Sequence, residues 1–396
     1  MTLNDIAHQL VITVGGPARE ARLARLLEEL SPYSPEVVTD WEIRGEQGDV
    51  MFSLQQFAIV PPQEVIDELK AKHGVDIEPN MPLGRAAVPN DPLYQDLWAF
   101  YKPQWDLYQM DAQGGWNCVT GSASPIVVAV IDSGIAQLHP DLAGLVHPAS
   151  RRIIGTLFDN LIEDEDGHGT LLSGTIAALT NNAIGMASAT WPITVRLLVL
   201  KFYDPWNPLD AASAAKSIAW AVLNGAKVIN ASWHVGMPSN FLLLNIAFAG
   251  FMDVLFVAAA GNEGTNNDDP HLPIYPASWI FLPNVVSVMA TNHHDDRPSF
   301  SNYGRNTVHI AAPGVHILST HYFLGPATSA VWRTYSGTSA AAAQVSAAAA
   351  IIRAFKPAWN AFAVRKYLVE KSVDPIPFLD CIAGGRLSLK RAICNL

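Results

Sequence analysis

The amino-acid sequence predicts an α/β protein of two domains, in which a small βαββαβ domain precedes a larger parallel sheet with helices on both faces. Three observations lead to this prediction. The 396 residues exceed the size at which one hydrophobic core usually stops growing. Apolar residues make up 49% of the chain and charged residues 15%, which favours a folded protein. A proline-rich stretch near residue 85 separates two different patterns of strands and helices.

The first domain, residues 1–85, is predicted from alternating strand and helix patterns. In chain order we expect a strand over residues 10–14, a helix over 18–30, strands over 37–43 and 50–60, a helix over 61–73 and a closing strand over 75–77. Pro61 suits the first turn of the second helix. The order βαββαβ is that of ferredoxin-like domains.

The second domain, residues 86–396, follows a linker that favours extended backbone. Residues 78–92 read EPNMPLGRAAVPNDP, and their four prolines prevent regular hydrogen bonding. From Trp98 onward, apolar runs such as IVVAVI and VRLLVLKF alternate with alanine-rich stretches such as AASAAKSIAWAVLNG. This alternation predicts a parallel sheet covered by helices on both faces.

Composition excludes two classes of partner. The chain has 25 Lys and Arg against 36 Asp and Glu, a net charge of −11, and no basic cluster, so nucleic acid is not expected. The longest apolar stretches, 126–131 and 254–260, are shorter than the roughly 20 residues that span a membrane. The first residues, MTLNDIAHQL, show no secretory signal, which predicts a cytoplasmic location, or secretion if a leader has been removed.

Cysteine usage predicts neither a disulfide framework nor a zinc site. The chain has three cysteines, Cys118, Cys381 and Cys394, without CxxC spacing. A single bridge between Cys381 and Cys394 stays open as an alternative.

Asp132 and His168 are candidate site residues. Asp132 ends the buried run IVVAVID, and ligand sites collect at the carboxyl ends of parallel strands. An Asp that only caps the next helix or turn is the alternative. His168 stands between glycines in DGHGT, before an apolar run that predicts a buried helix. A histidine with a purely structural role is the alternative there.

Ser339 is the candidate nucleophile. It lies in SGTSAAAAQVSAAAAII, where a glycine precedes a helix of small residues, so its hydroxyl is expected at a helix N-terminus. Helix capping is the alternative role for such a serine. A serine hydroxyl becomes a good nucleophile only beside an imidazole base that a carboxylate orients. Asp132, His168 and Ser339 supply these three groups from separate segments.

The segments AVIDSGI, DGHGT and SGTSAA, in this order, resemble the subtilisin-like serine peptidases, whose triad follows the order Asp, His, Ser. The resemblance runs from about residue 89 to the C-terminus. It implies an Asp132, His168 and Ser339 triad that hydrolyses peptide bonds through an acyl-enzyme, without a cofactor. AAAGNEG resembles the oxyanion segment of the family, which implies that Asn262 donates to the oxyanion together with the backbone N–H of Ser339.

The resemblance also implies the residues that bind a peptide or protein substrate. They are Ser232, Trp233, His234, Ala260, Gly261 and Glu263. His234 departs from the glycine-rich run of the family and adds bulk near a specificity pocket, unless its side chain turns to solvent. Glu263 is expected to favour a cationic substrate residue. After Ser339 the chain has alanines, including Ala343, where the family usually has methionine and proline.

Two further expectations follow from the resemblance. The first domain is implied to be a propeptide that acts as an intramolecular inhibitor and is removed by cleavage between residues 80 and 90. Asp141 and Asn182 match positions that often hold a structural calcium, although ordinary turn chemistry is the alternative. Two other functions stay open, a transpeptidase or peptide cyclase on the same scaffold and a silent peptide-binding protein.

Overall fold

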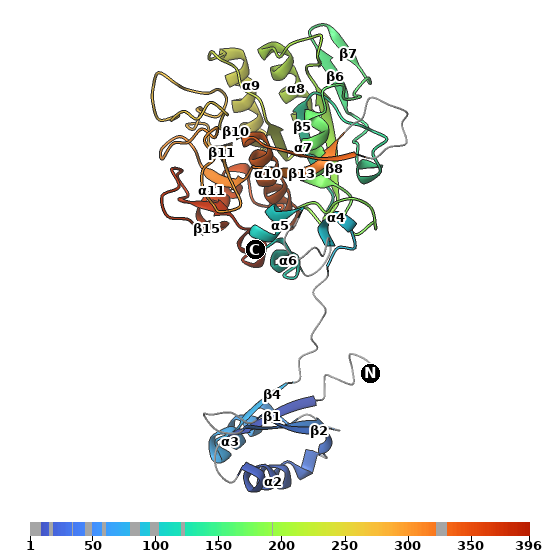
Figure 1. Cartoon of the computed structure of the whole chain (residues 1–396), viewed down its shortest axis with the longest axis vertical. Helices are drawn as coiled ribbons and strands as arrows, with labels where there is room; N and C mark the ends of the chain where they lie inside the picture. Colours follow the sequence, from blue (N-terminus) through green and yellow to red (C-terminus); the bar gives the residue numbers. More distant parts are fainter. Residues whose placement is uncertain are drawn as a thin grey trace. The chain divides into compact units, whose positions relative to one another are not determined.

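The computed structural model describes residues 9–15, 19–33, 35–43, 50–57, 61–79, 88–95, 103–119, 123–191, 193–321 and 331–396. The chain divides into two compact units, Met1–Arg85 and Ala86–Leu396 (Figure 1). Each unit has its own hydrophobic core. The predicted cleavage region falls mainly on residues 80–87, which lie outside the described residues.

The first unit has the element order βαββαβ. Its elements are β1 (Gln9–Gly15), α2 (Arg19–Glu29), a short 3-10 helix (Ser31–Tyr33), β2 (Pro35–Ile43), β3 (Val50–Phe57), α3 (Gln63–His73) and β4 (Asp76–Pro79). The strands form an antiparallel sheet in the order β2-β3-β1-β4. Ile12 and Val14 of β1 pack against Leu26 of α2 and Ile66 of α3, so the helices bury one face of this sheet.

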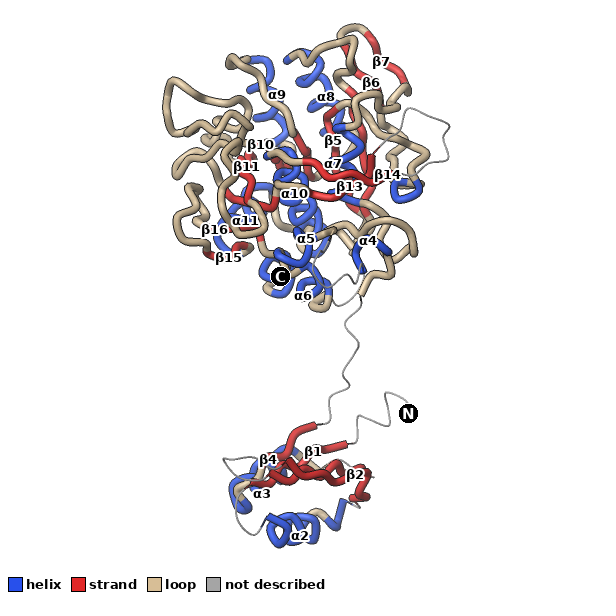
Figure 2. The backbone as a smooth tube through the Cα atoms, in the orientation of Figure 1, coloured by secondary structure: helices blue, strands red, loops and turns tan. Residues whose placement is uncertain are grey.

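The second unit is built on a ten-stranded sheet in the order β15-β16-β12-β11-β10-β9-β5-β8-β6-β7 (Figure 2). Its strands are β5 (Ile126–Asp132), β6 (Arg151–Ile154), β7 (Leu157–Asp159), β8 (Val195–Lys201), β9 (Val228–Ala231), β10 (Leu255–Ala259), β11 (Val285–Thr291), β12 (Ile310–Pro313), β15 (Val373–Pro375) and β16 (Gly385–Leu387). Neighbouring strands are parallel except at the two edges, where β15 and β7 run antiparallel. A separate hairpin is formed by β13 (Ile317–His321) and β14 (Val331–Tyr335).

Helices cover both faces of this sheet. They are α4 (Pro92–Gln95), α5 (Trp105–Gln109), α6 (Ala112–Trp116), α7 (His168–Ala177), α8 (Ala211–Leu223), α9 (Asn240–Phe251), α10 (Thr338–Phe355), α11 (Ala361–Lys371) and α12 (Leu389–Cys394), with a 3-10 turn at Pro140–Leu142. Along β5, Val128 and Val130 pack with α7 and α10, whereas Ala129 and Ile131 pack with α8 and α9. Because both faces are covered, β5 is apolar at every residue before its last, Asp132, as the sequence predicts.

Helix α10 is the central helix of the second unit. Among the described residues it is the one helix long and apolar enough to cross a membrane, but 94% of that window is buried inside the protein, as is typical of a core helix. Its alanines, including Ala343, are buried. Small side chains there allow the helix to pack closely on the sheet.

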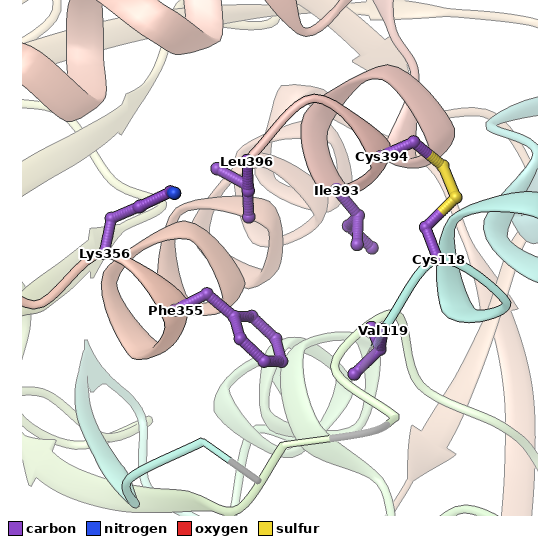
Figure 3. A pocket seen from close by; sticks show the side chains of 7 residues that line it. All are labelled: Cys118, Val119, Phe355, Lys356, Ile393, Cys394 and Leu396. Carbon is purple, nitrogen blue, oxygen red and sulfur yellow. A yellow bond between two sulfur atoms is a disulfide. The ribbon is translucent and has the colours of Figure 1, made fainter. Parts of the chain in front are cut away.

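A disulfide joins two segments of the second unit that are far apart in the sequence. It links Cys118, just after α6, to Cys394 at the end of α12, and their Cα atoms are 5.1 Å apart. Cys381 is buried and free, so the bridge considered between Cys381 and Cys394 is wrong. The sequence could not reveal this pairing because the two partners are 276 residues apart and meet only when α6 packs on α12. Figure 3 shows the bond beside a cavity of about 220 Å³ lined by Val119, Phe355 and Ile393.

Candidate active site

Asp132 lies fully buried at the carboxyl end of β5. Its Oδ1 atom accepts hydrogen bonds from the Ser133 amide at 2.8 Å and from His168 Nδ1 at 2.8 Å. The structure thus brings together the predicted carboxylate and imidazole. Since a carboxylate can only accept, Nδ1 of His168 carries the proton and Nε2 is left to exchange one with another group.

The loop before His168 fixes the start of α7. Asp164 accepts from the amide of Gly167 at 2.8 Å through one oxygen and from the amide of Thr170 at 2.9 Å through the other. Gly167 has φ of 99°, a left-handed conformation that glycine adopts without strain. Asp166 accepts from the amide of His168 at 3.2 Å. These bonds satisfy amides of the first helical turn and hold the His168 backbone in place.

The DSG and GHG segments touch each other through their glycines. A Cβ on Gly169 would lie 2.3 Å from the carbonyl oxygen of Gly134, so this contact excludes every side chain. The amide of Gly169 also donates to Ser133 Oγ at 2.9 Å. The spacing between Asp132 and His168 therefore depends on residues that have no catalytic group of their own.

The electrostatics of His168 favour its protonated form. Burial by itself lowers the pKa of His168, but the negative charges of Asp132, Asp166 and Asp164 outweigh burial and raise the pKa to about 8. Neutral His168, the form that accepts a proton, therefore predominates only in alkaline solution.

Ser339 is the second residue of α10 and is largely buried. Its Oγ donates to the carbonyl oxygen of Ser232 at 3.3 Å, and Ser232 Oγ donates in return to the carbonyl of Ser339 at 3.2 Å. Within the described part of the chain, Ser339 and His168 share no hydrogen bond. Catalytic hydrogen bonds are often loose without substrate and tighten when substrate binds.

Asn262 lies on an exposed segment beside the start of α10. Its Oδ1 accepts from the Thr338 amide at 2.8 Å and from Thr338 Oγ1 at 3.0 Å, which leaves the Nδ2 donors pointing away from these bonds. A Cβ on Gly337 would lie 3.5 Å from Asn262 Nδ2 and 3.7 Å from the amide nitrogen of Ser339. Both donors predicted for the oxyanion therefore border the same space next to Gly337.

The residues predicted to bind substrate follow two neighbouring parallel strands, β9 and β10. The Trp233 side chain is buried and donates to the carbonyl of Ile131 at 2.9 Å, so only its backbone can face a substrate. Ala260 is buried as well, and Gly261 adopts φ of 113°, where a Cβ would lie 2.3 Å from Asn302. Ser232 contacts Ser339, as described above.

The side chains of His234 and Glu263 approach each other across the ends of these two segments, and they form an ion pair when His234 is protonated. His234 Nε2 lies 3.3 Å from Glu263 Oε1, and the two side chains are 44% and 42% exposed. The other oxygen of Glu263 accepts from Asn302 Nδ2 at 2.9 Å. The His234 side chain thus turns toward Glu263, the residue that was expected to select a cationic substrate residue, and only a protonated His234 would offset the charge of Glu263.

Asp141 and Asn182, the predicted calcium ligands, lie in contact. The Asp141 carboxylate accepts from Asn182 Nδ2 at 3.1 Å, from the Met186 amide at 3.1 Å and from Trp332 Nε1 at 2.7 Å. Asp91 accepts from the amide of Asn182 at 3.2 Å, so a second carboxylate holds the same loop. Both carboxylates are fully buried, and burial raises the pKa of each above its ordinary value.

The donor set around this loop fits calcium in its chemistry. Two buried carboxylates and an asparagine amide are hard oxygen ligands, and a divalent cation would offset the cost of burying two negative charges. Asn182 at present donates to Asp141 and accepts from the Ile184 amide at 2.9 Å, so its amide must rotate to offer an oxygen. Among the described residues there is no group of three or more His, Cys, Asp or Glu side chains that could hold a metal ion.

The side chains of Asp91, Asp164 and Tyr203 contact these sites and were not predicted from the sequence. Tyr203 donates to Asp132 Oδ1 at 3.1 Å. Asp164 stands four residues before His168, and an acidic residue just before a helix is a recognisable N-terminal signal. Asp91 and Tyr203 act through contacts with distant parts of the chain, which no local pattern indicates.

Comparison with known proteins finds a matching family and several sequence relatives. Residues 123–384 match the model of the subtilase family. Subtilisin Savinase of Lederbergia lenta is 33% identical over 265 residues, which cover 67% of this chain and 89% of that protein. Thermitase of Thermoactinomyces vulgaris is 32% identical over 268 residues, with 67% and 85% coverage.

Solved structures show the same similarity. A protease from Pseudoalteromonas arctica PAMC 21717 superposes with a TM-score of 0.64 at 27% identity, covering 78% of this chain and 99% of that one. The epidermin leader peptide processing serine protease of Staphylococcus aureus has a TM-score of 0.64 at 20% identity and covers 97% of this chain and 98% of that one, which shows a shared fold. This chain belongs to the subtilase family and is a serine peptidase, a hydrolase that acts on peptide bonds.

Proposed function

We propose that the chain is a serine endopeptidase whose triad is Asp132, His168 and Ser339. The observation that supports this most directly is the 2.8 Å hydrogen bond between His168 Nδ1 and Asp132 Oδ1. A carboxylate at Nδ1 fixes the imidazole tautomer in which Nε2 accepts a proton from a hydroxyl.

In the proposed reaction, Ser339 Oγ attacks the carbonyl carbon of a peptide bond while His168 Nε2 takes its proton. To reach His168, the hydroxyl leaves its 3.3 Å contact with the Ser232 carbonyl. His168 then gives the proton to the departing amine, and an ester forms on Ser339. Water attacks this ester with His168 again as base, which releases the acid and restores the hydroxyl.

The oxyanion of each tetrahedral intermediate is proposed to bind Asn262 Nδ2 and the Ser339 amide. Support comes from their common position around Gly337 and from the bonds to Thr338 that orient the Asn262 amide. Donors fixed before the reaction stabilise developing charge without reorganising.

Covalent labelling tests the role of Ser339. A fluorophosphonate should modify the natural protein and add one phosphonyl group to the peptide that contains Ser339. Ser339→Ala should abolish both labelling and hydrolysis, whereas Ser336→Ala, three residues earlier, should retain both. Retained hydrolysis in Ser339→Ala, with no contaminating protease, would exclude this serine as the nucleophile.

The first unit is proposed to be a propeptide that inhibits the enzyme until it is cleaved away. Support comes from its separate fold and from the proline-rich sequence that follows it. The natural chain should shorten by about the first 85 residues during expression, and Ser339→Ala should stay at full length. Cleavage of the Ser339→Ala protein in cells without other proteases would contradict self-processing.

A structural calcium ion is proposed at Asp91, Asp141 and Asn182. It would add no chemistry to hydrolysis and would stabilise the loop on which Asn182 lies.

We also propose that the protein works outside the cytoplasm. The Cys118–Cys394 disulfide supports this location over the cytoplasmic one predicted from the sequence, because such bonds persist in oxidising compartments.

A further inference from the structure

Tyr203 lies two residues after the end of β8, and its side chain reaches the carboxylate of Asp132. Strands β5 and β8 are parallel, with Asp132 opposite Lys201, and the amide of Phe202 donates to the Asp132 carbonyl at 3.0 Å. Tyr203 therefore follows the last ladder bond between the two strands. This register places residue 203 at the same edge of the sheet as Asp132.

The ring of Tyr203 is held by its aromatic neighbours. It packs edge to face on Phe202 with ring centroids 5.3 Å apart, and Phe202 in turn lies 5.2 Å from the ring of Trp233. Phe202 and Trp233 are buried, and Trp233 is fixed by its bond to the Ile131 carbonyl. The packing of Tyr203 on Phe202, and of Phe202 on Trp233, thus fixes the position of the Tyr203 hydroxyl.

One oxygen of Asp132 receives every hydrogen bond that the structure gives this carboxylate. Oδ1 accepts from the Ser133 amide, His168 Nδ1 and Tyr203 Oη, the last at 3.1 Å. Within the described part of the chain, Oδ2 is buried and has no hydrogen-bond partner. The phenol therefore shares with His168 the atom on which the imidazolium depends.

We propose that Tyr203 is a positioning residue of the triad, which orients the Asp132 carboxylate and moderates the proton affinity of His168. This inference rests on the proposed triad. A hydrogen bond to the carboxylate stabilises its negative charge, so the charge attracts a proton on His168 less strongly. Burial, together with the Asp132 charge, raises the pKa of Tyr203, so the phenol stays a donor.

The Tyr203→Phe variant tests the inference because it removes only the hydroxyl. We expect the pKa of His168 to rise above its value of about 8 in the natural protein. A rise of about half a unit to one unit would lower kcat/KM about 3- to 10-fold on the acid side of the profile, with KM unchanged. Tyr108→Phe is the matched control, since Tyr108 Oη donates to the Tyr94 carbonyl at 2.9 Å, away from Asp132.

The pKa of His168 is measured by NMR titration of its imidazole in the Ser339→Ala background, which keeps the protein uncut and requires no activity. A second comparison adds Tyr203→Phe to Asp132→Asn, where it should shift the His168 titration no further. The inference would be overturned if the pKa of His168 were the same with and without Tyr203→Phe. It would also be overturned if Tyr203→Phe shifted this pKa as much in the Asp132→Asn variant as it does when Asp132 is present. A failure of the proposed peptidase function would show in the Ser339 labelling experiment, which is independent of Tyr203.

Discussion

The Cα of Gly169 faces the carbonyl oxygen of Gly134 so closely that an added Cβ would lie 2.3 Å from it. This contact joins the segment after Asp132 to the helix that starts at His168. The geometry of the proposed Asp132 and His168 pair therefore depends on the absence of a side chain at residue 169, which has no chemical role of its own.

Gly169→Ala should impair both activity and stability. The methyl group must push α7 away from β5 and lengthen the Asp132 to His168 contact, and misplacement by about 1 Å can cost about 100-fold in rate. We expect kcat/KM to fall by about that factor and Tm to fall. Gly236→Ala is the control, because a Cβ there meets nothing within 4 Å. Unchanged kinetics in Gly169→Ala would contradict the packing described here.

Activity and stability should respond to pH in opposite directions near the pKa of His168. In the proposed mechanism hydrolysis needs neutral His168, so kcat/KM should rise through pH about 8 and level off above it. The folded pKa lies above the ordinary value of about 6.5, so protonated His168 stabilises the fold. This contribution is complete below pH about 6.5 and is lost as pH rises through about 8.

Asp132→Asn provides the control for both pH effects. It removes the charge that raises the pKa of His168, so the acid limb of the rate profile and the pH dependence of Tm should both move to lower pH. Rates and melting curves measured over the same buffers would show this. If the midpoint of the acid limb stays near pH about 8 in the variant, the group that titrates there is not His168.

Breaking the Cys118–Cys394 bond should destabilise the second unit. Closing a loop this long restricts the unfolded chain, and loss of such a bond typically costs about 2–5 kcal/mol. Reduction should lower Tm of the natural protein and leave a Cys118→Ser, Cys394→Ser double variant unchanged. Thiol labelling of the unfolded, unreduced protein should find one free cysteine, Cys381. Three reactive thiols would rule the bond out.

Calcium should raise Tm through Asp91 and Asp141. Added calcium should stabilise the natural protein and a chelator should destabilise it, because the ion binds the folded loop and not the unfolded chain. Asp141→Asn should abolish the response, whereas Asp296→Asn, at an exposed turn, should keep it. A natural protein that melts at one temperature with calcium and with chelator would refute the site.

The ion pair of His234 with Glu263 should influence which residue is accepted before the cleaved bond. Where His234 is protonated, its charge offsets that of Glu263, so under those conditions His234→Ala should raise the ratio of kcat/KM for a lysine over a leucine substrate about 3- to 10-fold. Glu263→Gln should lower the same ratio. A peptide series that differs only at that residue gives the measurement, and equal ratios in all three proteins would place the pair outside the substrate site.

Much of the fold was predictable because its signals are local. The apolar run that ends at Asp132 and the alanine-rich stretch after Ser339 each specify an element by themselves, and the structure has β5 and α10 there. The positions of Asp132 and His168 at one edge of the sheet follow from the rule that ligand sites collect at the carboxyl ends of parallel strands.

The remaining features depend on packing between distant segments. Tyr203 reaches Asp132 only because β8 lies beside β5, and Cys118 meets Cys394 only because α6 packs on α12. The Trp233 side chain belongs to the core, although its position in the sequence suggested a substrate contact. Periodicity predicts that a residue is in a strand, but not which neighbour its side chain meets.

A peptidase is surrounded by copies of itself, so every loose end of its chain is a target for cleavage. Proteolysis usually begins where a terminus frays, because the backbone must detach before it can enter an active site. The Cys118–Cys394 bond ties the first helices of the second unit to its last one. Neither α6 nor α12 can detach without the other, so the bond should slow self-digestion at these two helices.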